Sequence, residues 1–407
     1  MRVLYSIGIG LYGLGIRLAA TLGHAKGKQM CAGWKETMKR LDDKGIGTGE
    51  TVWFHVSSMG EFEQARPVLE AFKKSHNDWK IVVTFFSPSG YEVRKDYKEA
   101  DCVCYLPMDT RRNAKRMVEK IRPKIVYFVK YDFWYNYMRE IKRSGAKMYI
   151  FSTIFRRNQY FFKWYGGWFR KQLKGFDHLF VQNEESLKLL KENGIEQCTI
   201  AGDTRFDRVN DITKAARRFE EIETFVGDKK VLMAGSSWEP DEERIKNFVD
   251  QYKGELKLIL APHMIHEEHI QKIVALFGAE NCVRYTQLQK NDMGKRVLII
   301  DTMGMLAAMY RYATIAYIGG GFGQGIHNIL EAVTFGKPVV FGPNYKKFKE
   351  AHDILERGGG KSYTENRELN EILDHWLNNE ESYQQASKVC ADYVAENLGA
   401  TQTILKR

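Results

Sequence analysis

Short apolar runs rich in β-branched residues recur along this chain of 407 residues, and helical patterns separate them. The runs lie at residues 52–56, 81–84, 125–129, 148–151, 178–181, 231–234, 256–260, 297–300, 314–318 and 338–341. Strand and helix patterns in alternation predict parallel sheets that helices cover on both faces. Residues 203–228 are charged and hold no strand pattern, so we expect a linker there between two such domains.

The predicted fold is α/β, with two doubly wound, Rossmann-like domains that face a central cleft and an N-terminal membrane-associated segment before them. The expected parts are residues 1–40 (the segment and its basic flank), 41–207 and 208–385 (the two domains) and 386–407 (a C-terminal helix, the end of a helical pattern over 380–406). Ligands of doubly wound domains bind beyond the carboxyl ends of the strands. We therefore expect functional residues directly after strands.

Residues 318–345 hold the most pronounced motif of the chain. Five glycines occur within the seven residues 319–325, a helical pattern follows from Asn328, and the apolar run 338–341 ends the unit. Glycines let backbone N–H groups approach a ligand closely, and a helix N-terminus favours negative charge. The unit predicts a phosphate site.

The spacing in this motif differs from that of a dinucleotide fingerprint. That fingerprint needs G-x-G-x-x-G, with an acidic residue about 20 positions later. Here Gly321, Gly323 and Gly325 alternate with other residues, and the acid comes early, at Glu331. Glu331 could accept hydrogen bonds from ribose hydroxyls, or it could close a capping box with Asn328 as the N-cap; both interpretations stay open.

Positive charge is concentrated in the first half of the chain. The formal net charge is +11, and residues 111–174 contain 18 Lys and Arg against three acidic residues. This excess predicts an anionic partner: nucleic acid, a phospholipid surface or a phosphorylated substrate. Residues 154–174 interleave aromatic rings with cations, which suits either a membrane interface or stacked single-stranded nucleic acid. The apolar N-terminus favours lipid.

Residues 3–16 carry no charge and are followed by basic residues within 26–40. Fourteen uncharged residues are fewer than the roughly 20 that span a bilayer. A signal peptide is the alternative, because Arg2 could serve as its basic region. The basic residues downstream are typical of a cytoplasmic flank, and the six cysteines show no C-x-x-C pair or metal-ligand spacing. We expect reduced thiols and a segment that lies in, or is partly inserted into, the membrane.

Glu61 is the candidate general base. It follows the run 52–56 and begins a helical pattern, with Gly60 beside it. The alternative is structural, because Ser58-x-x-Glu61 matches a capping box. A helix N-terminus lowers the pKa of a carboxyl, whereas a base acting on a sugar hydroxyl gains from a raised one, so burial would have to compensate.

Other residues after predicted strands bring further polar and aromatic groups to the same edges. Residues 131–134 place Asp132 among aromatic rings, where it could bind a sugar or cap an aromatic core. His263, His266 and His269 lie three apart, but no carboxylate is placed as an obvious third ligand, so we expect no metal site.

Several motifs resemble those of the 3-deoxy-D-manno-octulosonic acid (Kdo) transferases of lipopolysaccharide biosynthesis. They are Ser57-x-x-Gly60-Glu61, the segment 201–207, residues 301–304, residues 327–331 and residues 341–343. The match runs in the family's order from the apolar N-terminus to about Phe348.

The resemblance implies a glycosyltransferase B-type fold and an inverting transfer of Kdo from CMP-Kdo to the phosphorylated, acylated disaccharide precursor of lipid A. It implies an enzyme on the cytoplasmic face of the cell inner membrane, with that membrane surface as a partner. Neither a cofactor, a metal ion in the active site nor a nucleic-acid partner is implied. The domain 41–207 would bind the acceptor, and the domain 208–385 the CMP-sugar donor.

Site residues are carried over motif by motif. Glu61 would be the catalytic base. The CMP contacts would be Pro262, His263, Met303, Gly304, Met305, Asn328, Ile329, Leu330 and Glu331, and the candidate acceptor contacts are Ser57, Gly60, Asp132, Arg156 and Arg157. The chain departs from the family at three of these positions: His263 replaces a common arginine, Met305 a frequent acid and Asp132 a usual glutamate.

Two rival interpretations remain at this point. A nucleotide-sugar epimerase would share the two-domain architecture and a similar glycine-rich unit, but it would need neither the anchor nor the basic aromatic segment. A membrane-attached nucleotide-binding module without catalysis would tolerate Glu61→Gln.

Overall fold

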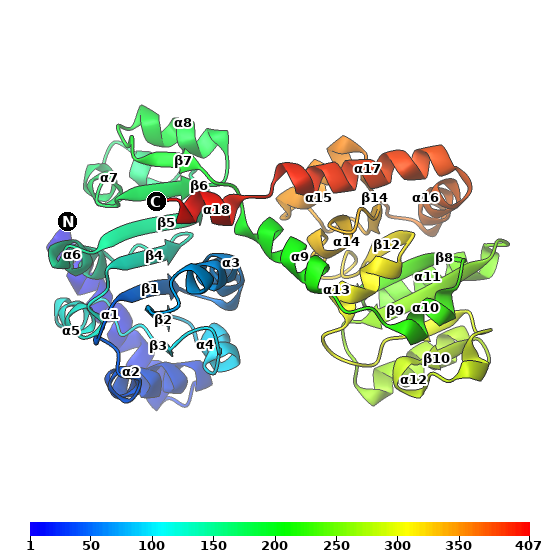
Figure 1. The fold of residues 1–407 in the computed structure, drawn as a ribbon, viewed down its shortest axis with the longest axis horizontal. Coiled ribbons are helices and arrows are strands. Elements are labelled where there is room, and N and C mark those ends of the chain that lie inside the picture. The colour runs from blue at the N-terminus through cyan, green and yellow to red at the C-terminus, as the bar shows by residue number, and fades with distance from the viewer. The chain divides into compact units, whose positions relative to one another are not determined.

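The computed structural model describes residues 1–407, which form two units (Figure 1). The first unit comprises Met1–Arg208 and Leu398–Arg407, and the second comprises Val209–Asn397. Helix α9 (Thr204–Ala215) carries the chain from one unit to the other.

The first unit is built on a parallel sheet of seven strands in the order β3-β2-β1-β4-β5-β6-β7. The strands are β1 (Thr51–Val56), β2 (Lys80–Phe85), β3 (Cys102–Tyr105), β4 (Ile125–Val129), β5 (Lys147–Thr153), β6 (His178–Val181) and β7 (Cys198–Ile200). Its helices are α1 (Arg2–Thr21), α2 (Ala25–Asp43), α3 (Met59–Ser75), α4 (Pro88–Arg94), α5 (Arg111–Ile121), α6 (Tyr135–Ser144), α7 (Gly167–Leu173), α8 (Glu184–Glu192) and α18 (Ala400–Leu405), with a 3-10 turn at Tyr160–Phe162. Strand order reverses direction beside β1, so the loop after β1 lies at a topological switch point, where doubly wound sheets bind their ligands.

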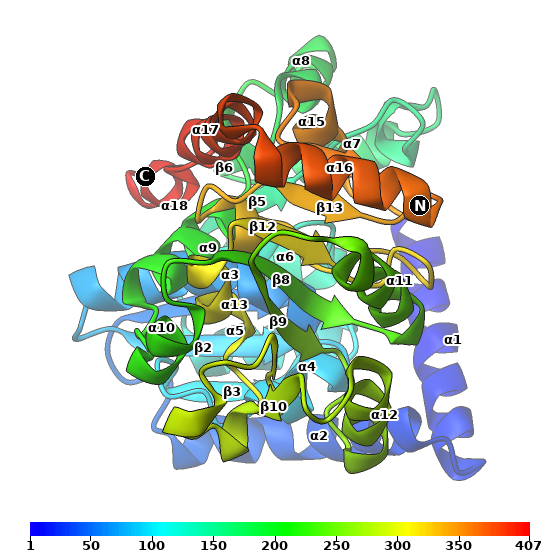
Figure 2. The same ribbon diagram turned by 90° about the vertical axis from the view of Figure 1, so that its right-hand side faces the viewer.

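The second unit repeats this plan with the strand order β10-β11-β9-β8-β12-β13-β14. Its strands are β8 (Lys230–Ser237), β9 (Leu256–Pro262), β10 (Cys282–Arg284), β11 (Val297–Ile299), β12 (Ile315–Ile318), β13 (Val339–Phe341) and β14 (Gly360–Ser362). Its helices are α10 (Glu220–Val226), α11 (Glu239–Gln251), α12 (Glu267–Phe277), α13 (Leu306–Met309), α14 (Leu330–Val333), α15 (Lys349–Arg357), α16 (Asn366–Asn378) and α17 (Glu380–Glu396), with 3-10 turns at Tyr285–Gln287, Lys290–Asp292 and Tyr310–Tyr312. Figure 2 shows α11 and α12 on one side of this sheet and α10 and α13 on the other.

The predicted α/β architecture is confirmed: all ten predicted strands exist, and every strand pairing is parallel. Four strands were missed, namely β3, β7, β10 and β14. Each is an edge strand of three or four residues. Because each holds at most one Val or Ile, none forms an apolar run long enough to recognise. The buried β-branched runs mark only the centre of each sheet.

Helix α1 is longer than the uncharged run that predicted it. It has 20 residues, and by length and composition it could cross a membrane, although only 11% of its most apolar window is buried inside the structure. A signal sequence near an N-terminus passes the same test. Tyr5 holds α1 to the first unit, because its hydroxyl donates a hydrogen bond to Asp109. The outer residues of α1 remain exposed, among them Val3, Leu4 and Leu11.

The C-terminal segment corrects one prediction. The pattern over 380–406 predicted a single helix, but α17 ends at Glu396 and α18 begins at Ala400. Gly399 has a φ of 100°, which stops the helix, and its N–H donates to the carboxylate of Asp207. Helix α18 (red in Figure 1) therefore packs on α3 in the first unit, while α17 belongs to the second.

Candidate functional site

Glu61 lies in the first turn of α3, directly after β1. Ser58 is the N-cap, and its hydroxyl accepts a hydrogen bond from the Glu61 N–H at 3.4 Å. The Glu61 carboxylate accepts from the Ser57 N–H instead of the Ser58 N–H that a capping box would use. Half of the predicted capping box is therefore present, and the Glu61 carboxylate is bound one residue earlier than that motif requires.

Burial has the largest effect on the pKa of the Glu61 carboxyl. It raises the pKa of the Glu61 carboxyl, and the nearby Asp132 carboxylate raises it further. The Ser57 N–H, the His55 ring and the Lys130 ammonium act in the opposite direction, but the pKa remains above its ordinary value. A carboxyl with this pKa accepts a proton more readily than an exposed one, which is what a general base needs.

His55 is a residue of this region that the sequence did not single out. It is fully buried in β1, with Nδ1 2.9 Å from the Thr84 hydroxyl and Nε2 2.9 Å from Asp132 Oδ2. The indole N–H of Trp134 also donates to His55 Nε2, at 3.0 Å. The sequence feature that could have pointed to His55 is a histidine within an otherwise apolar strand pattern.

Asp132 and Trp134 place opposite requirements on the protonation of His55 Nε2. An indole nitrogen only donates, so its bond to Nε2 needs that nitrogen unprotonated. An ionised Asp132 only accepts, so its contact with the same atom needs Nε2 protonated. With an ionised Asp132, only one of these two contacts is a hydrogen bond in a given tautomer of His55.

The remaining candidate acceptor residues, Gly60, Arg156 and Arg157, make no hydrogen bond to the Glu61 carboxylate. Gly60 is exposed and has open space around it. Arg156 is exposed, and Arg157 pairs with Glu192 of α8 at 3.0 Å. The contacts of Glu61 include neither arginine, so their role in acceptor binding stays a prediction.

In the second unit, the glycine-rich loop follows β12 as expected, but its backbone amides are already partly used. The Gly319 N–H donates to Gly235 O at 2.9 Å, and the Gly320 N–H donates to the buried Asp241 carboxylate at 2.9 Å. The N–H groups of Gly321, Phe322 and Gln324 have no acceptor within the protein. These three amides are the ones available to an anionic ligand.

Close packing against neighbouring backbone, as well as access for a ligand, explains why this loop contains glycines. A Cβ at Gly319 would lie 2.2 Å from Ser236 O, and one at Gly321 would lie 2.5 Å from the backbone nitrogen of Gly342. A Cβ at Gly323 would meet nothing nearer than 3.7 Å. Gly319 and Gly321 therefore let the loop lie against neighbouring strand ends.

The helix after this loop is shorter than predicted. Helix α14 has four residues and its N-cap is Ile329, so neither a long macrodipole nor the capping box of Asn328 and Glu331 forms. Asn328 accepts from the Leu330 N–H and donates to Glu331 Oε1 at 3.1 Å. Burial raises the pKa of the Glu331 carboxyl, and the Asn328 bond opposes this.

A cavity of about 510 Å³ lies over the glycine loop within the second unit. Its walls include three rings: His263 stacks on Trp238 with centroids 4.5 Å apart and on His327 with centroids 4.6 Å apart. The Trp238 indole donates to His327 Nε2 at 3.2 Å. His263 was predicted here, His327 belongs to a motif that was given no role for it, and Trp238 was not predicted.

The other predicted donor contacts have mixed surroundings. Pro262 is the buried last residue of β9, and Met305 is buried before α13, while Met303 is 80% exposed and Gly304 has open space around it. Asp301, just before them, is occupied by Arg284 and Thr286. Whether Met303, Gly304 and Met305 contact CMP stays a prediction.

The histidines considered for a metal have other partners. His266 caps α12, accepting from the His269 N–H at 3.3 Å, and the His269 ring lies 3.1 Å from the buried Glu242 carboxylate. No cluster of three His, Cys, Asp or Glu side chains suited to a metal ion occurs in the structure. All six cysteines are free, and five of them are buried.

Known proteins resemble both the sequence and the fold. The family described as 3-Deoxy-D-manno-octulosonic-acid transferase (kdotransferase) matches residues 32–208. A 3-deoxy-D-manno-octulosonic acid transferase of Chlamydophila psittaci is 28% identical over 329 residues, 77% of this chain and 74% of that protein. The enzyme of that name from Aquifex aeolicus is 28% identical over 315 residues, 76% of this chain and 80% of that protein.

Among solved structures, UDP-GlcNAc 2-epimerase from Neisseria meningitidis superposes with a TM-score of 0.60 at 15% identity, covering 88% of this chain and 98% of that one. Likeness at this identity shows the fold alone, and the fold is of the glycosyltransferase B type, as expected. The sequence matches go further: residues 32–208 resemble the Kdo transferase family, and proteins named Kdo transferase are 26–28% identical over most of the chain, which supports a glycosyltransferase of this kind.

Proposed function

We propose that the protein transfers Kdo, with inversion, from CMP-Kdo to the phosphorylated disaccharide precursor of lipid A, in the synthesis of the lipopolysaccharide inner core. The observation that carries this proposal is Glu61: a carboxyl after the switch-point strand β1, with a pKa raised by burial, in a chain that resembles the Kdo transferase family. An inverting transfer needs one base and no covalent sugar–enzyme intermediate, so a single such carboxyl suffices.

In this reaction Glu61 removes the proton from an acceptor hydroxyl as its oxygen attacks the anomeric carbon of Kdo. The bond from that carbon to the phosphate breaks, and CMP leaves with the bonding electron pair. The Ser57 N–H holds one carboxylate oxygen of Glu61, which leaves the other oxygen for the incoming proton. Asp132 supports the base because its charge favours protonation of Glu61.

The second unit would bind the donor. The unpaired amides of Gly321, Phe322 and Gln324 suit the single phosphate of CMP and would stabilise its charge on departure. The rings of His263 and Trp238 offer a stacking surface for a base. We assign Glu331 to the ribose hydroxyls.

The first unit would bind the acceptor at the cytoplasmic face of the inner membrane. Its basic residues between 111 and 174 suit a phosphorylated lipid, and α1 suits an enzyme whose acceptor stays in the bilayer. The membrane location is part of the proposal.

The direct experiment is to incubate the purified protein with CMP-Kdo and lipid A precursor and to analyse the lipid by mass spectrometry. We expect a product heavier than the acceptor by one or more Kdo residues, and the mass gives their number. An unchanged lipid would refute the acceptor assignment. Formation of an epimerised sugar from a nucleotide-sugar donor, with no lipid product, would support the epimerase alternative.

A further inference from the structure

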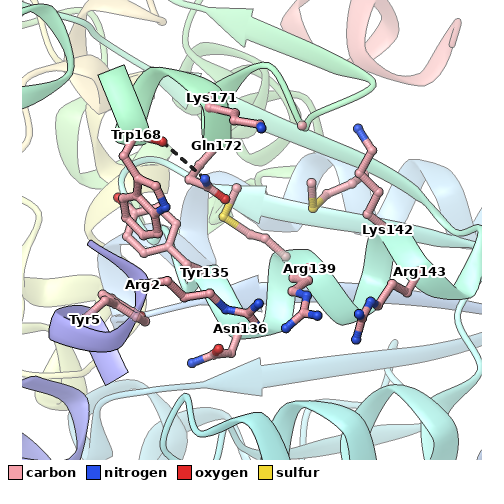
Figure 3. Close-up of a pocket in the computed structure, with 13 residues that line it drawn as sticks. Arg2, Tyr5, Tyr135, Asn136, Arg139, Lys142, Arg143, Trp168, Lys171 and Gln172 are labelled. Carbon is pink, nitrogen blue, oxygen red and sulfur yellow. Dashed lines mark hydrogen bonds between the residues drawn. The ribbon is translucent and has the colours of Figure 1, made fainter. Parts of the chain in front are cut away.

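A groove in the first unit lies apart from the residues assigned to catalysis. The beginning of α1 and the helices α6 and α7 enclose a cavity of about 530 Å³ (Figure 3). Neither Glu61 nor any residue of its hydrogen-bond network lines it. The groove is therefore not an extension of the candidate active site.

Cations dominate the lining of this groove. They are Arg2, Arg139, Lys142, Arg143 and Lys171. Figure 3 shows Arg2, Arg139 and Arg143 along one side and Lys171 on α7 across from them. No carboxylate lines the cavity, and only Arg143 has an acidic partner, Glu140 at 3.1 Å. Four uncompensated cations in one concave surface favour an anionic ligand.

Asp109, a buried acid that contacts two residues of the lining, does not itself line the groove. Asp109 is buried beneath the groove and accepts hydrogen bonds from the Tyr5 hydroxyl and from the N–H groups of Asn136 and Tyr137. Burial raises the pKa of the Asp109 carboxyl to about 7, and its oxygens are already occupied by these donors of the protein. In contrast, the Nη2 group of Arg2 is buried and has no hydrogen-bond partner.

One end of the groove is aromatic (Figure 3). Tyr135 contacts Tyr5 and Trp168 edge to face, with centroids 4.8 and 4.7 Å away. The exposed apolar side of α1 begins at the same place, where Val3 and Leu4 are 67% and 65% exposed. Aromatic rings beside cations, continuous with an apolar helix surface, are typical of the head-group level of a membrane.

We propose that this groove binds the phosphate head group of an anionic phospholipid, whose acyl chains lie along the exposed side of α1. The arginines supply paired N–H donors to the phosphate oxygens, and Lys142 and Lys171 supply further charge. The site would hold the protein at the membrane in one orientation, because a groove fixes the head group where a diffuse basic surface would not. The inference needs neither donor nor acceptor, so it can fail independently of the proposed enzymatic function.

The test compares vesicle binding by the full-length protein and two triple variants. Arg139→Glu/Lys142→Glu/Lys171→Glu removes the unpaired cations of α6 and α7. Lys74→Glu/Lys188→Glu/Lys191→Glu changes the net charge equally, at exposed lysines of α3 and α8 that have no ion-pair partner and do not line the groove. Each protein is sedimented with phosphatidylcholine vesicles and with vesicles that also contain phosphatidylglycerol.

We expect the groove variant to lose at least about tenfold of the preference for anionic vesicles, and the control to keep most of it. Binding to neutral vesicles through α1 should be common to all three proteins. An equal loss in both variants would show a diffuse charge effect, and retention in the groove variant would show no effect of the groove; each result refutes the proposal. Binding of inorganic phosphate without vesicles that the groove variant loses, while it keeps the preference for anionic vesicles, would identify a free-phosphate site instead and refute the proposal. If the groove variant does not fold, as judged by circular dichroism, Arg139→Gln and Lys171→Gln provide the same comparison.

Discussion

The two units place their candidate sites at equivalent positions, after the carboxyl ends of parallel strands, but they equip them differently. After β1, the site consists of titratable side chains: His55 and Asp132 are in contact, and both influence the pKa of the Glu61 carboxyl. After β12, it consists of backbone amides and stacked rings, and its buried acid, Asp241, is used to hold the loop. In the proposed function, the same fold would thus provide the base in one unit and the donor site in the other.

The difference determines which substitutions matter in each unit. Where side-chain charge does the chemistry, a neutral replacement of the same shape should abolish function without disturbing the fold. Where backbone amides of the glycine loop bind the phosphate, a substitution within that loop should matter only if it moves the loop.

Glu61→Gln should have the largest effect. The amide preserves the shape of the side chain but cannot take up the hydroxyl proton, so we expect kcat to fall by roughly 10²- to 10⁴-fold. Donor affinity, which depends on the other unit, should stay unchanged. The measurements are the rate of lipid product formation by mass spectrometry and CMP-Kdo binding by calorimetry.

Glu63→Gln is the matched control for this substitution. Glu63 lies two residues further along α3, at the surface, and pairs with Arg94 at 2.8 Å. It should retain nearly full activity, since partly exposed ion pairs contribute little. Full turnover in Glu61→Gln would remove the base assignment and leave the first unit without a proton acceptor.

Gly321→Ala should have the next largest effect, in the second unit. Its Cβ would lie 2.5 Å from the Gly342 backbone nitrogen, which cannot move aside cheaply, so the loop must shift. Overpacking of this kind costs about 1–3 kcal/mol, and we expect the KM for the donor to rise about tenfold or more.

Gly323→Ala tests whether the loop responds to geometry and not to any added methyl group. A Cβ at Gly323 has 3.7 Å of room, so this variant should bind the donor almost normally. Equal behaviour of the two variants would contradict the idea that close packing of Gly321 shapes the phosphate site.

Long apolar runs such as 256–260 and 314–318 were sufficient to predict the two sheets, because buried parallel strands carry a continuous β-branched signal. The edge strands β3, β7, β10 and β14 could not be predicted, because each holds at most one Val or Ile and so lacks this signal. Helix α14 was overestimated for a related reason: the apolar residues after Asn328 pack around a single turn instead of extending a helix.

The site was predictable only where a motif carried it. Glu61 and His263 were found through motifs, but His55 was not, because its importance comes from Asp132 and Trp134, 77 and 79 residues away. The sequence also does not show which backbone N–H groups are already hydrogen-bonded within the protein. Nothing in the order of the glycines says that the Gly320 amide is bound to Asp241 while the Gly321 amide is free.

Asp132→Asn tests the coupling of charges in the first unit. Because the Asp132 carboxylate contributes to the raised pKa of Glu61, its removal should lower that pKa. The base is lost when pH falls through the Glu61 pKa, so the acidic limb of kcat/KM should move to lower pH. Burial, the larger cause, remains, and the limb should stay above that of an exposed glutamate.

The pH profile separates this role from a structural one. Asparagine can still hydrogen-bond to His55, so the rate at alkaline pH should fall much less than in Glu61→Gln. A uniform loss at every pH, with the limb unmoved, would mean that Asp132 acts by binding the acceptor and not through Glu61.

Arg244→Met should have the smallest effect and probes the side-chain support of the glycine loop. The Arg244 guanidinium lies 3.8 Å from the centroid of the Phe322 ring, and Phe322 lines the cavity over the loop. Methionine keeps the apolar length but removes the cation, a loss of about 1 kcal/mol, which corresponds to roughly fivefold in donor affinity.

Lys246→Met, on the same helix but paired with Asp250, is the control and should leave donor affinity unchanged. Because neither residue belongs to the Glu61 network, kcat at saturating donor should be the same in both variants. A fall in kcat without a change in affinity would mean that the loop takes part in chemistry beyond donor binding, and the contrast between the two units would then be weaker than their contacts indicate.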